Sequence, residues 1–180
     1  GIFVKEHLGI EGYTYLGEDI VNHCIKDILC KGAIPITFMD YYGCHRLNKE
    51  SLEHYINGIS KACIKTNCCI TNGQTMEMKD IYNYNKVELI GCISGIVDRK
   101  HIINGKQKIK DGDICIGLHG FCPSNDGYNL IRKLFIDKKH LFTKEIIEHL
   151  ITPNKCYLHD IISLYDSKIP ISGLCYLKSG

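Results

Sequence analysis

The sequence predicts an α/β chain, or a closely related α+β arrangement, folded in two lobes. Segments with apolar residues at helical spacing alternate with short apolar runs that are typical of strands. Two turn signals, Asn104-Gly105 and Asp111-Gly112, lie close together in the middle of the chain and separate these segments into two groups. We therefore expect an N-terminal domain over residues 1–105 and a second domain over residues 111–180.

The first lobe is expected to begin with a helix, a strand and a second helix. Residues 18–31 place apolar side chains at helical spacing, and Gly32 supplies a C-terminal stop. The apolar run 34–39 predicts a strand with Asp40 at its carboxyl end. Asn48 can cap the second helix, which carries an apolar face as far as position 63.

Two more strands are expected to complete the first lobe. Residues 68–71 predict a short strand that enters a polar loop. A longer strand is expected over residues 87–97, where Gly91 and Gly95 mark bends or a close approach of another chain segment.

The second lobe is expected to mix the two kinds of element again. Its predicted elements are a strand over 113–118, helices over 126–136, 145–150 and 157–165, and a final strand over 171–177. Periodicity alone does not determine how the strands of either lobe pair.

The composition is that of an ordinary globular protein. Charged residues make up 23% of the chain and leave a net charge of +2, so there is no electrostatic reason to expect nucleic acid or an anionic membrane as a partner. No apolar run approaches the roughly 20 residues of a membrane-spanning helix, and no secretory signal is visible.

The 11 cysteines are odd in number and irregularly spaced, and some lie in apolar runs such as Ile114-Cys115-Ile116. No C-x-x-C motif or zinc-finger spacing occurs. We expect reduced thiols, no disulfide, no zinc site and a cytoplasmic location.

The most specific motif runs from residue 31 to residue 42. Gly32-Ala33-Ile34-Pro35 joins the first helix to the first strand, and Asp40-Tyr41-Tyr42 follows. Glycine can end the helix, and proline fixes φ at the start of the strand. Other segments occur in the order and spacing of one known family. They are residues 17–21, 73–78, 103–105, 111–113 and 126–133, together with Pro153 and Tyr157.

These segments resemble the motifs of the aminoimidazole ribonucleotide synthetases, the phosphoribosylformylglycinamidine cyclo-ligases. The resemblance covers essentially the whole chain, but only about the middle half of a full family member. It implies an N-terminal α/β domain that forms a homodimer through a shared barrel, followed by part of a second α/β domain. It also implies a small-molecule nucleotide substrate, ATP and Mg²⁺. The chain has no P-loop motif, in keeping with this family.

The resemblance further implies the reaction. ATP phosphorylates the formyl oxygen of formylglycinamidine ribonucleotide, a nitrogen of the substrate attacks, and phosphate leaves as the imidazole ring closes.

Two carboxylates correspond to acids of the family's metal and ATP site. These are Asp27 and Asp40, and magnesium on a nucleotide takes one or two such ligands. Asp40 is expected at the end of a strand, where ligand sites of α/β proteins gather. Asp27 lies off the apolar stripe of its helix, so a solvated surface acid is the alternative.

A second implied group contacts ATP from the loop expected after residue 71. Gln74 and Thr75 are candidate ATP contacts, and Glu77, which keeps an acid of the family, is a candidate catalytic residue. Lys5 ends what remains of the family's glycine-rich loop and is a further candidate ATP contact. His45, in the loop expected after the first strand, is also retained as a candidate.

A third implied group precedes the helix expected over residues 126–136. Asn125 and Gly127 are candidate ATP contacts, because a glycine ahead of a helix suits a phosphate. Asp126 is a candidate catalytic residue, or alternatively the cap of that helix.

Several departures from the family fall on its chemistry. Gln74 replaces an acid, Ser124 and Tyr176 replace histidines, and Lys26 replaces an asparagine. The sequence therefore leaves two alternatives to an active cyclo-ligase. One is a catalytically degenerate paralogue that keeps the dimer and possibly nucleotide binding, and the other is a different member of the same ATP-binding superfamily.

Overall fold

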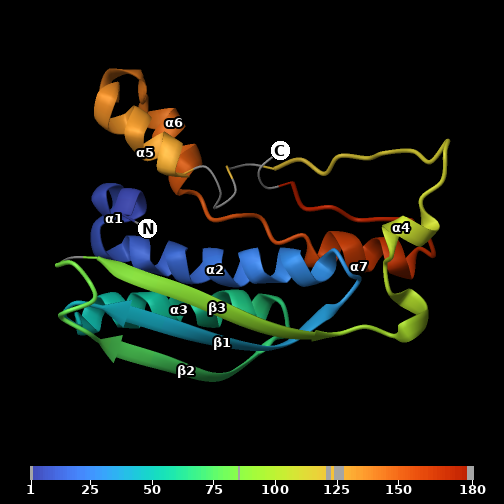
Figure 1. The fold of residues 1–180 in the computed structure, drawn as a ribbon, viewed down its shortest axis with the longest axis horizontal. Coiled ribbons are helices and arrows are strands. Elements are labelled where there is room, and N and C mark those ends of the chain that lie inside the picture. Colours follow the sequence, from blue (N-terminus) through green and yellow to red (C-terminus); the bar gives the residue numbers. More distant parts are fainter. Residues whose placement is uncertain (1, 85, 121–122, 124–127, 178–180) are drawn as a thin grey trace.

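The computed structural model describes residues 2–84, 86–120, 123 and 128–177, without the side chains of residues 2, 3 and 5. Helices and strands alternate in its first half, and helices follow in its second half (Figure 1). In chain order the elements are α1 (Ile2–Leu8), η1 (Gly9–Glu11), α2 (Gly12–Leu29), β1 (Ile34–Cys44), α3 (Lys49–Lys65), β2 (Cys69–Glu77), β3 (Val87–Ile96), η2 (Arg99–His101), α4 (Gly105–Lys108), α5 (Tyr128–Asp137), η3 (Lys139–Leu141), α6 (Lys144–Ile151) and α7 (Leu158–Asp166).

The sheet has the strand order β2-β1-β3. The central strand β1 runs parallel to β2 and antiparallel to β3. Helices α2 and α3 lie side by side and cover one face of this sheet (Figure 1). The mixed α/β class expected from the sequence is confirmed.

The core lies between the sheet and these two helices. Phe38 and Tyr42 of β1 contribute fully buried rings, which meet Tyr55 and Ile59 of α3 and Ile25 of α2. The rings of Tyr42 and Tyr55 pack with their centroids 5.4 Å apart. Burial of such side chains supplies most of the driving force for packing the helices on the sheet.

Both helix-end predictions for the first lobe are confirmed. Gly32 adopts a φ of +80°, the left-handed conformation that glycine favours after a helix, and its N–H donates to Leu29 O at 2.8 Å. Asn48 caps α3, because its side-chain oxygen accepts from Ser51 N–H at 2.8 Å. The helix predicted over residues 18–31 is α2, and it starts earlier than predicted, at Gly12, because Tyr13 and Leu16 extend its buried face.

Two strands are longer than the sequence predicted. Strand β1 continues past Asp40 to Cys44 because β2 and β3 pair with it on both sides over that length. Strand β2 continues to Glu77, so the segment expected to be a polar loop is an edge strand. Pairing with β1 overrides the weak strand propensity of its Asn, Gly and Gln residues.

The two strands predicted in the second lobe are wrong. Residues 113–118 and 171–177 form no strand, and Ile114 is 87% and Ile116 79% exposed. An apolar run becomes a strand only when another strand accepts its backbone hydrogen bonds, and no described residue does so here. The helices expected in this lobe are present as α5, α6 and α7.

The segment around residue 154 and helix α7 pack on α2, on the side away from the sheet (Figure 1). Leu158 and Ile161 of α7 are buried in the same core cluster as the sheet residues. The second half of the chain is thus anchored on α2. Among the helices of the described residues, none is long and apolar enough to cross a membrane.

Candidate functional site

A pocket of about 530 Å³ lies between α2, the start of β3 and the α5–α6 region. Most of its lining residues are apolar, among them Leu16, Ile20 and Leu89. The polar residues Asp19, His23, Tyr128, Arg132 and Thr152 complete the lining. A concave, largely apolar surface with a few polar groups is the usual form of a small-molecule site.

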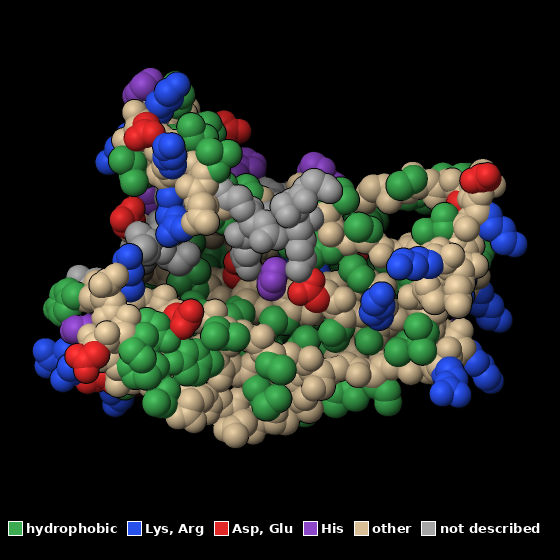
Figure 2. Space-filling model, viewed as in Figure 1, with side chains coloured by type: hydrophobic (Ala, Val, Ile, Leu, Met, Phe, Trp, Pro, Cys, Tyr) green, Lys and Arg blue, Asp and Glu red, His purple; other side chains and the backbone are tan. Residues whose placement is uncertain are grey.

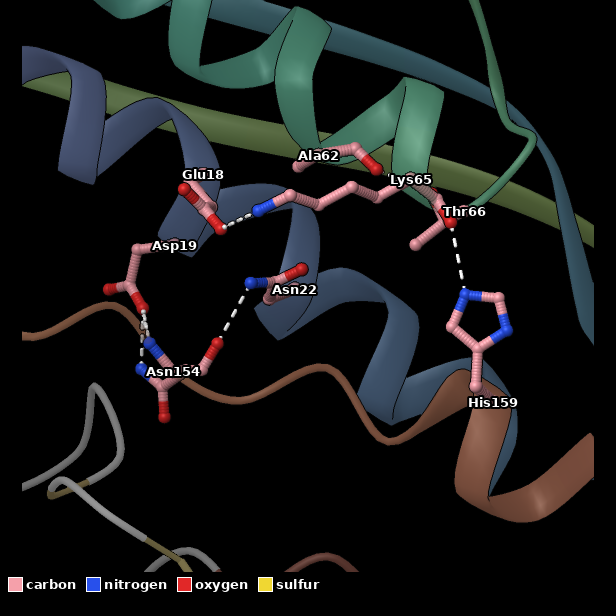
Figure 3. A network of polar contacts seen from close by, with 8 residues as sticks. All are labelled: Glu18, Asp19, Asn22, Ala62, Lys65, Thr66, Asn154 and His159. Carbon is pink, nitrogen blue, oxygen red and sulfur yellow. Dashed lines mark hydrogen bonds and ion pairs between the residues drawn. The ribbon is translucent and has the colours of Figure 1, made fainter.

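Asn154 bonds to α2 through all of its polar groups. Figure 3 shows its contacts with Asp19 and Asn22. Its backbone N–H and its side-chain amide donate to Asp19 Oδ1 at 2.8 and 2.6 Å. Its backbone oxygen accepts from Asn22 Nδ2 at 2.8 Å, and its side-chain oxygen accepts from Lys26 Nζ at 2.8 Å. Asp19, Asn22 and Lys26, which are spaced by about one helical turn along α2, therefore fix the segment that follows α6.

Lys26 is only 5% exposed, which is unusual for a lysine. Besides its hydrogen bond to Asn154, its ammonium group lies 4.6 Å from the centroid of the Tyr176 ring. A cation over an aromatic face is stabilised electrostatically when water is excluded. His23 also packs edge-on against Tyr176 and lies 3.9 Å from Asp27.

A second polar group ties α7 to α3 beside this network (Figure 3). Lys65 Nζ donates to Glu18 Oε1 at 2.9 Å, and the backbone oxygen of Lys65 lies 3.1 Å from His159 Nε2. The Lys65 side chain is 64% exposed, so this ion pair contributes at most about 1 kcal/mol to stability.

The structure does not bring Asp27 and Asp40 together. Asp27 lies on α2 beside His23, 3.9 Å from its Nε2, and its side chain is 47% exposed. Asp40 lies in the middle of β1 and shares a face of the strand with the buried Phe38 and Tyr42, so it faces the helix layer. The expectation that Asp40 ends a strand is wrong.

Asp40 is half-buried between the sheet and the helices. Its side chain lies against Gly73 of β2, where any added Cβ would overlap its Oδ1. Burial raises the pKa of the Asp40 carboxyl above its ordinary value of 3.8, and a hydrogen bond from its own backbone N–H opposes that shift. Asp40 also contributes, after burial, to raising the pKa of Tyr55.

The side chains of Gln74, Thr75 and Glu77 do not point toward one common site, because they lie on strand β2 and not in a loop. As neighbours in β2, Gln74 and Thr75 point to opposite faces of the sheet. Gln74 is paired with Tyr41 on the face without helices, and its amide contacts Met76 Sδ at 3.1 Å. Glu77 lies at the strand end, where its carboxylate accepts from Leu47 N–H at 2.9 Å and pairs with Lys79 at 3.7 Å.

The hydrogen bond from Leu47 N–H is the main cause that lowers the pKa of Glu77, and Lys79 and Arg46 add to it. His45 lies nearby and contacts backbone oxygens, with its Nδ1 2.8 Å from Tyr82 O. A second pocket, of about 460 Å³, opens beside Arg46 and Lys86. The described contacts of Glu77 and His45 stabilise the loops next to β2.

The other candidates lie outside the described part of the molecule. Asn125, Asp126, Gly127 and Ser124 are not among the described residues, and of Lys5 only the backbone is described, within α1.

Sequence reasoning noticed Lys26 only as a departure and did not single out Asn154. A lysine among apolar residues on a helix gives a weak signal, since long lysine stems often cover apolar surface while the ammonium stays in water. Only the fold shows that this ammonium is buried and bonded to a residue 128 positions further along the chain.

The fold defines the class of protein, an α/β chain with a pocket between its sheet-and-helix layer and its second half. Residues 2–97, more than half of the chain, match the family model described as "AIR synthase related protein, N-terminal domain". The chain therefore belongs to the AIR synthase related family.

Curated relatives cover nearly the whole chain. A phosphoribosylformylglycinamidine cyclo-ligase of Clostridium tetani is 35% identical over 100% of this chain and 54% of its own length. The protein of the same name from Clostridium perfringens strain 13 is 39% identical over 93% of this chain and 50% of its own length. The chain thus spans about half the length of these relatives.

Solved structures of low sequence identity share the fold. The structure of E. coli HypE, a hydrogenase maturation protein, superposes with a TM-score of 0.61 at 17% identity, over 86% of this chain and 44% of that one. The structure described as AaThiL complexed with AMPPCP and TMP superposes with a TM-score of 0.53 at 15% identity, over 84% of this chain and 46% of that one.

Proposed function

We propose that this chain is the central part of an ATP-dependent cyclo-ligase that converts formylglycinamidine ribonucleotide to aminoimidazole ribonucleotide in purine synthesis. The observation that carries the proposal is the identity of 35–39% to proteins named phosphoribosylformylglycinamidine cyclo-ligase, over 93–100% of this chain. In the proposed reaction ATP activates the formyl oxygen of the substrate, and ring closure then expels phosphate.

ATP is the proposed co-substrate, in keeping with a fold that also occurs in a protein crystallised with AMPPCP. Asp27 lies beside His23 on α2, whereas Asp40 lies in the middle of β1, and no contact joins the two carboxylates in the described part of the chain. In the described part of the chain, no three His, Cys, Asp or Glu side chains form a metal-binding group.

The remaining site assignments are proposals as well. Glu77 and Asp126 are proposed catalytic residues. Lys5, Gln74, Thr75, Asn125 and Gly127 are proposed ATP contacts. Residues 1–105 and 111–180 are proposed as parts of separate domains, and the cytoplasm as the location.

We also propose a homodimer formed through the face of the sheet that the helices leave open. Met39 and Tyr41 of β1 share this face with their β3 partners Cys92 and Ile90. Met39 is 37% and Ile90 52% exposed, and Figure 2 shows hydrophobic side chains gathered over the strands in this view. A two-layer fold with one bare apolar face needs a partner layer to cover it.

The decisive assay supplies formylglycinamidine ribonucleotide, ATP and Mg²⁺ to the full-length protein and measures substrate-dependent ADP and aminoimidazole ribonucleotide. We expect turnover, and we expect Asp27→Asn and Asp40→Asn each to lower kcat by about 10²- to 10³-fold, as loss of a pre-organised charge commonly does. Glu53→Gln is the matched control, because Glu53 is an exposed carboxylate that pairs with Lys49 on the surface.

One observation favours a second candidate, the catalytically degenerate paralogue. Gln74 carries no charge, and its side-chain nitrogen donates to Met76 Sδ at 3.1 Å, so it offers no carboxylate to a ligand. A folded full-length protein that binds ATP but yields no product would establish this alternative and exclude the cyclo-ligase.

A further inference from the structure

Asp19 is a carboxylate that lines the pocket above α2 without a direct cationic partner. Its Oδ1 accepts two hydrogen bonds, from the backbone and side-chain nitrogens of Asn154. In Figure 3 its second oxygen points away from Asn154. Within the described residues no lysine, arginine or histidine lies within ion-pair distance of Asp19. One oxygen is therefore fixed while the other remains available to a ligand.

The fixed oxygen is held by an arrangement that continues to a buried charge. Lys26 Nζ donates to Asn154 Oδ1 at 2.8 Å, and Asn154 Nδ2 donates to Asp19 Oδ1 at 2.6 Å. An ammonium bonded to the amide oxygen polarises the amide and strengthens the donor at its other end. Asn22 Nδ2 donates to the backbone oxygen of Asn154 and so fixes the position from which the Asn154 side-chain amide extends. The rotamer of Asp19 is thus set before any ligand arrives.

This geometry suits a cationic group with N–H donors. A carboxylate binds an amidine through charge-assisted hydrogen bonds, as it binds a guanidinium. A neutral carbonyl in the same place would offer the carboxylate no donor and would oppose it with a second acceptor. Leu16 and Ile20 of the same helix line the pocket with Asp19, and they limit the screening of its charge by water. Arg132 and His23 also line this pocket, beyond ion-pair distance of Asp19.

We propose that Asp19 binds the amidine of the substrate, and that Asn154 and Lys26 are positioning residues that orient its carboxylate. The proposal rests on the function proposed above and names the group that selects formylglycinamidine ribonucleotide over its amide analogue, in which an oxygen replaces the amidine nitrogen.

The test compares the two ligands on the full-length protein. Isothermal titration calorimetry measures the Kd of formylglycinamidine ribonucleotide and of formylglycinamide ribonucleotide for the wild type, Asp19→Asn and Lys26→Met. We expect the wild type to prefer the amidine by about 10- to 100-fold, the range for a hydrogen bond to a charged group. Asp19→Asn should lose that preference and keep its affinity for the amide analogue, which also shows that the variant is folded.

Lys26→Met should lower the preference only in part, because Asn154 still reaches Asp19. Lys65→Met is the control, since it removes an ion pair of the same helix layer that does not line the pocket, and it should leave both Kd values unchanged. A wild-type preference for the amidine that survives Asp19→Asn overturns this inference and leaves the cyclo-ligase in place. Failure of the wild type to bind either ligand, together with absence of turnover, overturns both.

Discussion

At the scale of single residues, Asp40 shows how position in the fold changes the chemistry of a side chain. It lies in the central strand and faces a helix layer whose neighbouring side chains are aromatic. Burial raises the pKa of its carboxyl above 3.8, so ionisation costs more in the folded state than in the unfolded chain. Below pH 3.8 both states hold the proton, and the cost is absent. The destabilisation develops as the pH rises from 3.8 through the raised pKa of Asp40 in the folded state.

We therefore predict that Asp40→Asn raises the melting temperature at pH 7 and that the gain disappears as the pH falls below 3.8. The side chain is half-exposed, and solvent screening limits the gain to less than about 1 kcal/mol. Thermal unfolding monitored by circular dichroism from pH 3 to pH 8 measures it. A loss of stability at pH 7 would show that the carboxylate has a stabilising partner. If Asp40→Asn gains stability but loses turnover, the carboxylate serves function and lowers the stability of the fold.

The cysteines provide a second test at this scale. In the described part of the chain ten cysteines are free thiols, and they differ widely in exposure. Cys63 is 2% exposed, and burial, with smaller contributions from Cys68, raises the pKa of its thiol to about 12. Because the thiolate is the reactive form, this group should be inert at neutral pH.

We predict that iodoacetamide at pH 8 alkylates the exposed Cys69 at least about 100-fold faster than Cys63 in the native protein, and that both react alike in urea. Peptide mass spectrometry at timed intervals measures the ratio. The same experiment without reductant should find no disulfide-bonded peptide, and a native bridge at any pair would contradict the expectation of reduced thiols.

At the scale of elements, the contact between α2 and α3 depends on two glycines that face each other. A Cβ at Gly17 would overlap the backbone oxygen of Tyr55, and a Cβ at Gly58 would overlap that of Thr14. The helix backbones therefore approach more closely than side chains would allow. This close approach lets both helices lie on a sheet of only three strands.

We expect Gly17→Ala and Gly58→Ala each to lower the free energy of unfolding by about 1–3 kcal/mol, although alanine is the better helix former, because the helices must move apart. Urea denaturation followed by circular dichroism measures the loss. Gly117→Ala is the control, since a Cβ at Gly117 meets nothing within 4 Å and should change stability little. If the helix variants proved as stable as the wild type, the close helix contact would be wrong.

At the scale of the whole molecule, the sheet has one covered face and one open face. The covered face holds the core, and the open face carries Met39 and Ile90 in contact with solvent. The sheet cannot bury its second face with the described residues of one chain. This is the physical basis for the proposed homodimer.

We predict that the full-length protein sediments as a dimer at micromolar concentration and that Met39→Glu shifts it to the monomer, because a carboxylate on the open face cannot be buried unpaired. Analytical ultracentrifugation across a concentration series measures the shift. Ile64→Glu, at a position on α3 that is 78% exposed, should leave the dimer intact. A wild type that is monomeric throughout would refute the dimer.

The sequence alone determined the class of fold and the family, because both depend on local order along the chain. The periodicity that predicts α3, the Asn48 cap and the Gly32 stop act within a few residues, and the structure confirms each of them. The Gly32-Ala33-Ile34-Pro35 and Asp40-Tyr41-Tyr42 motif resembled the cyclo-ligase family, and the family match over residues 2–97 agrees.

The tertiary structure alone decided how far each strand extends and which polar residues meet. Residues 73–77 became strand and residues 113–118 did not, because a strand exists only where a neighbour completes its hydrogen bonds. Lys26 and Asn154 meet although 128 positions separate them along the chain. Contacts between distant segments arise from packing in three dimensions, and no spacing along the chain encodes them.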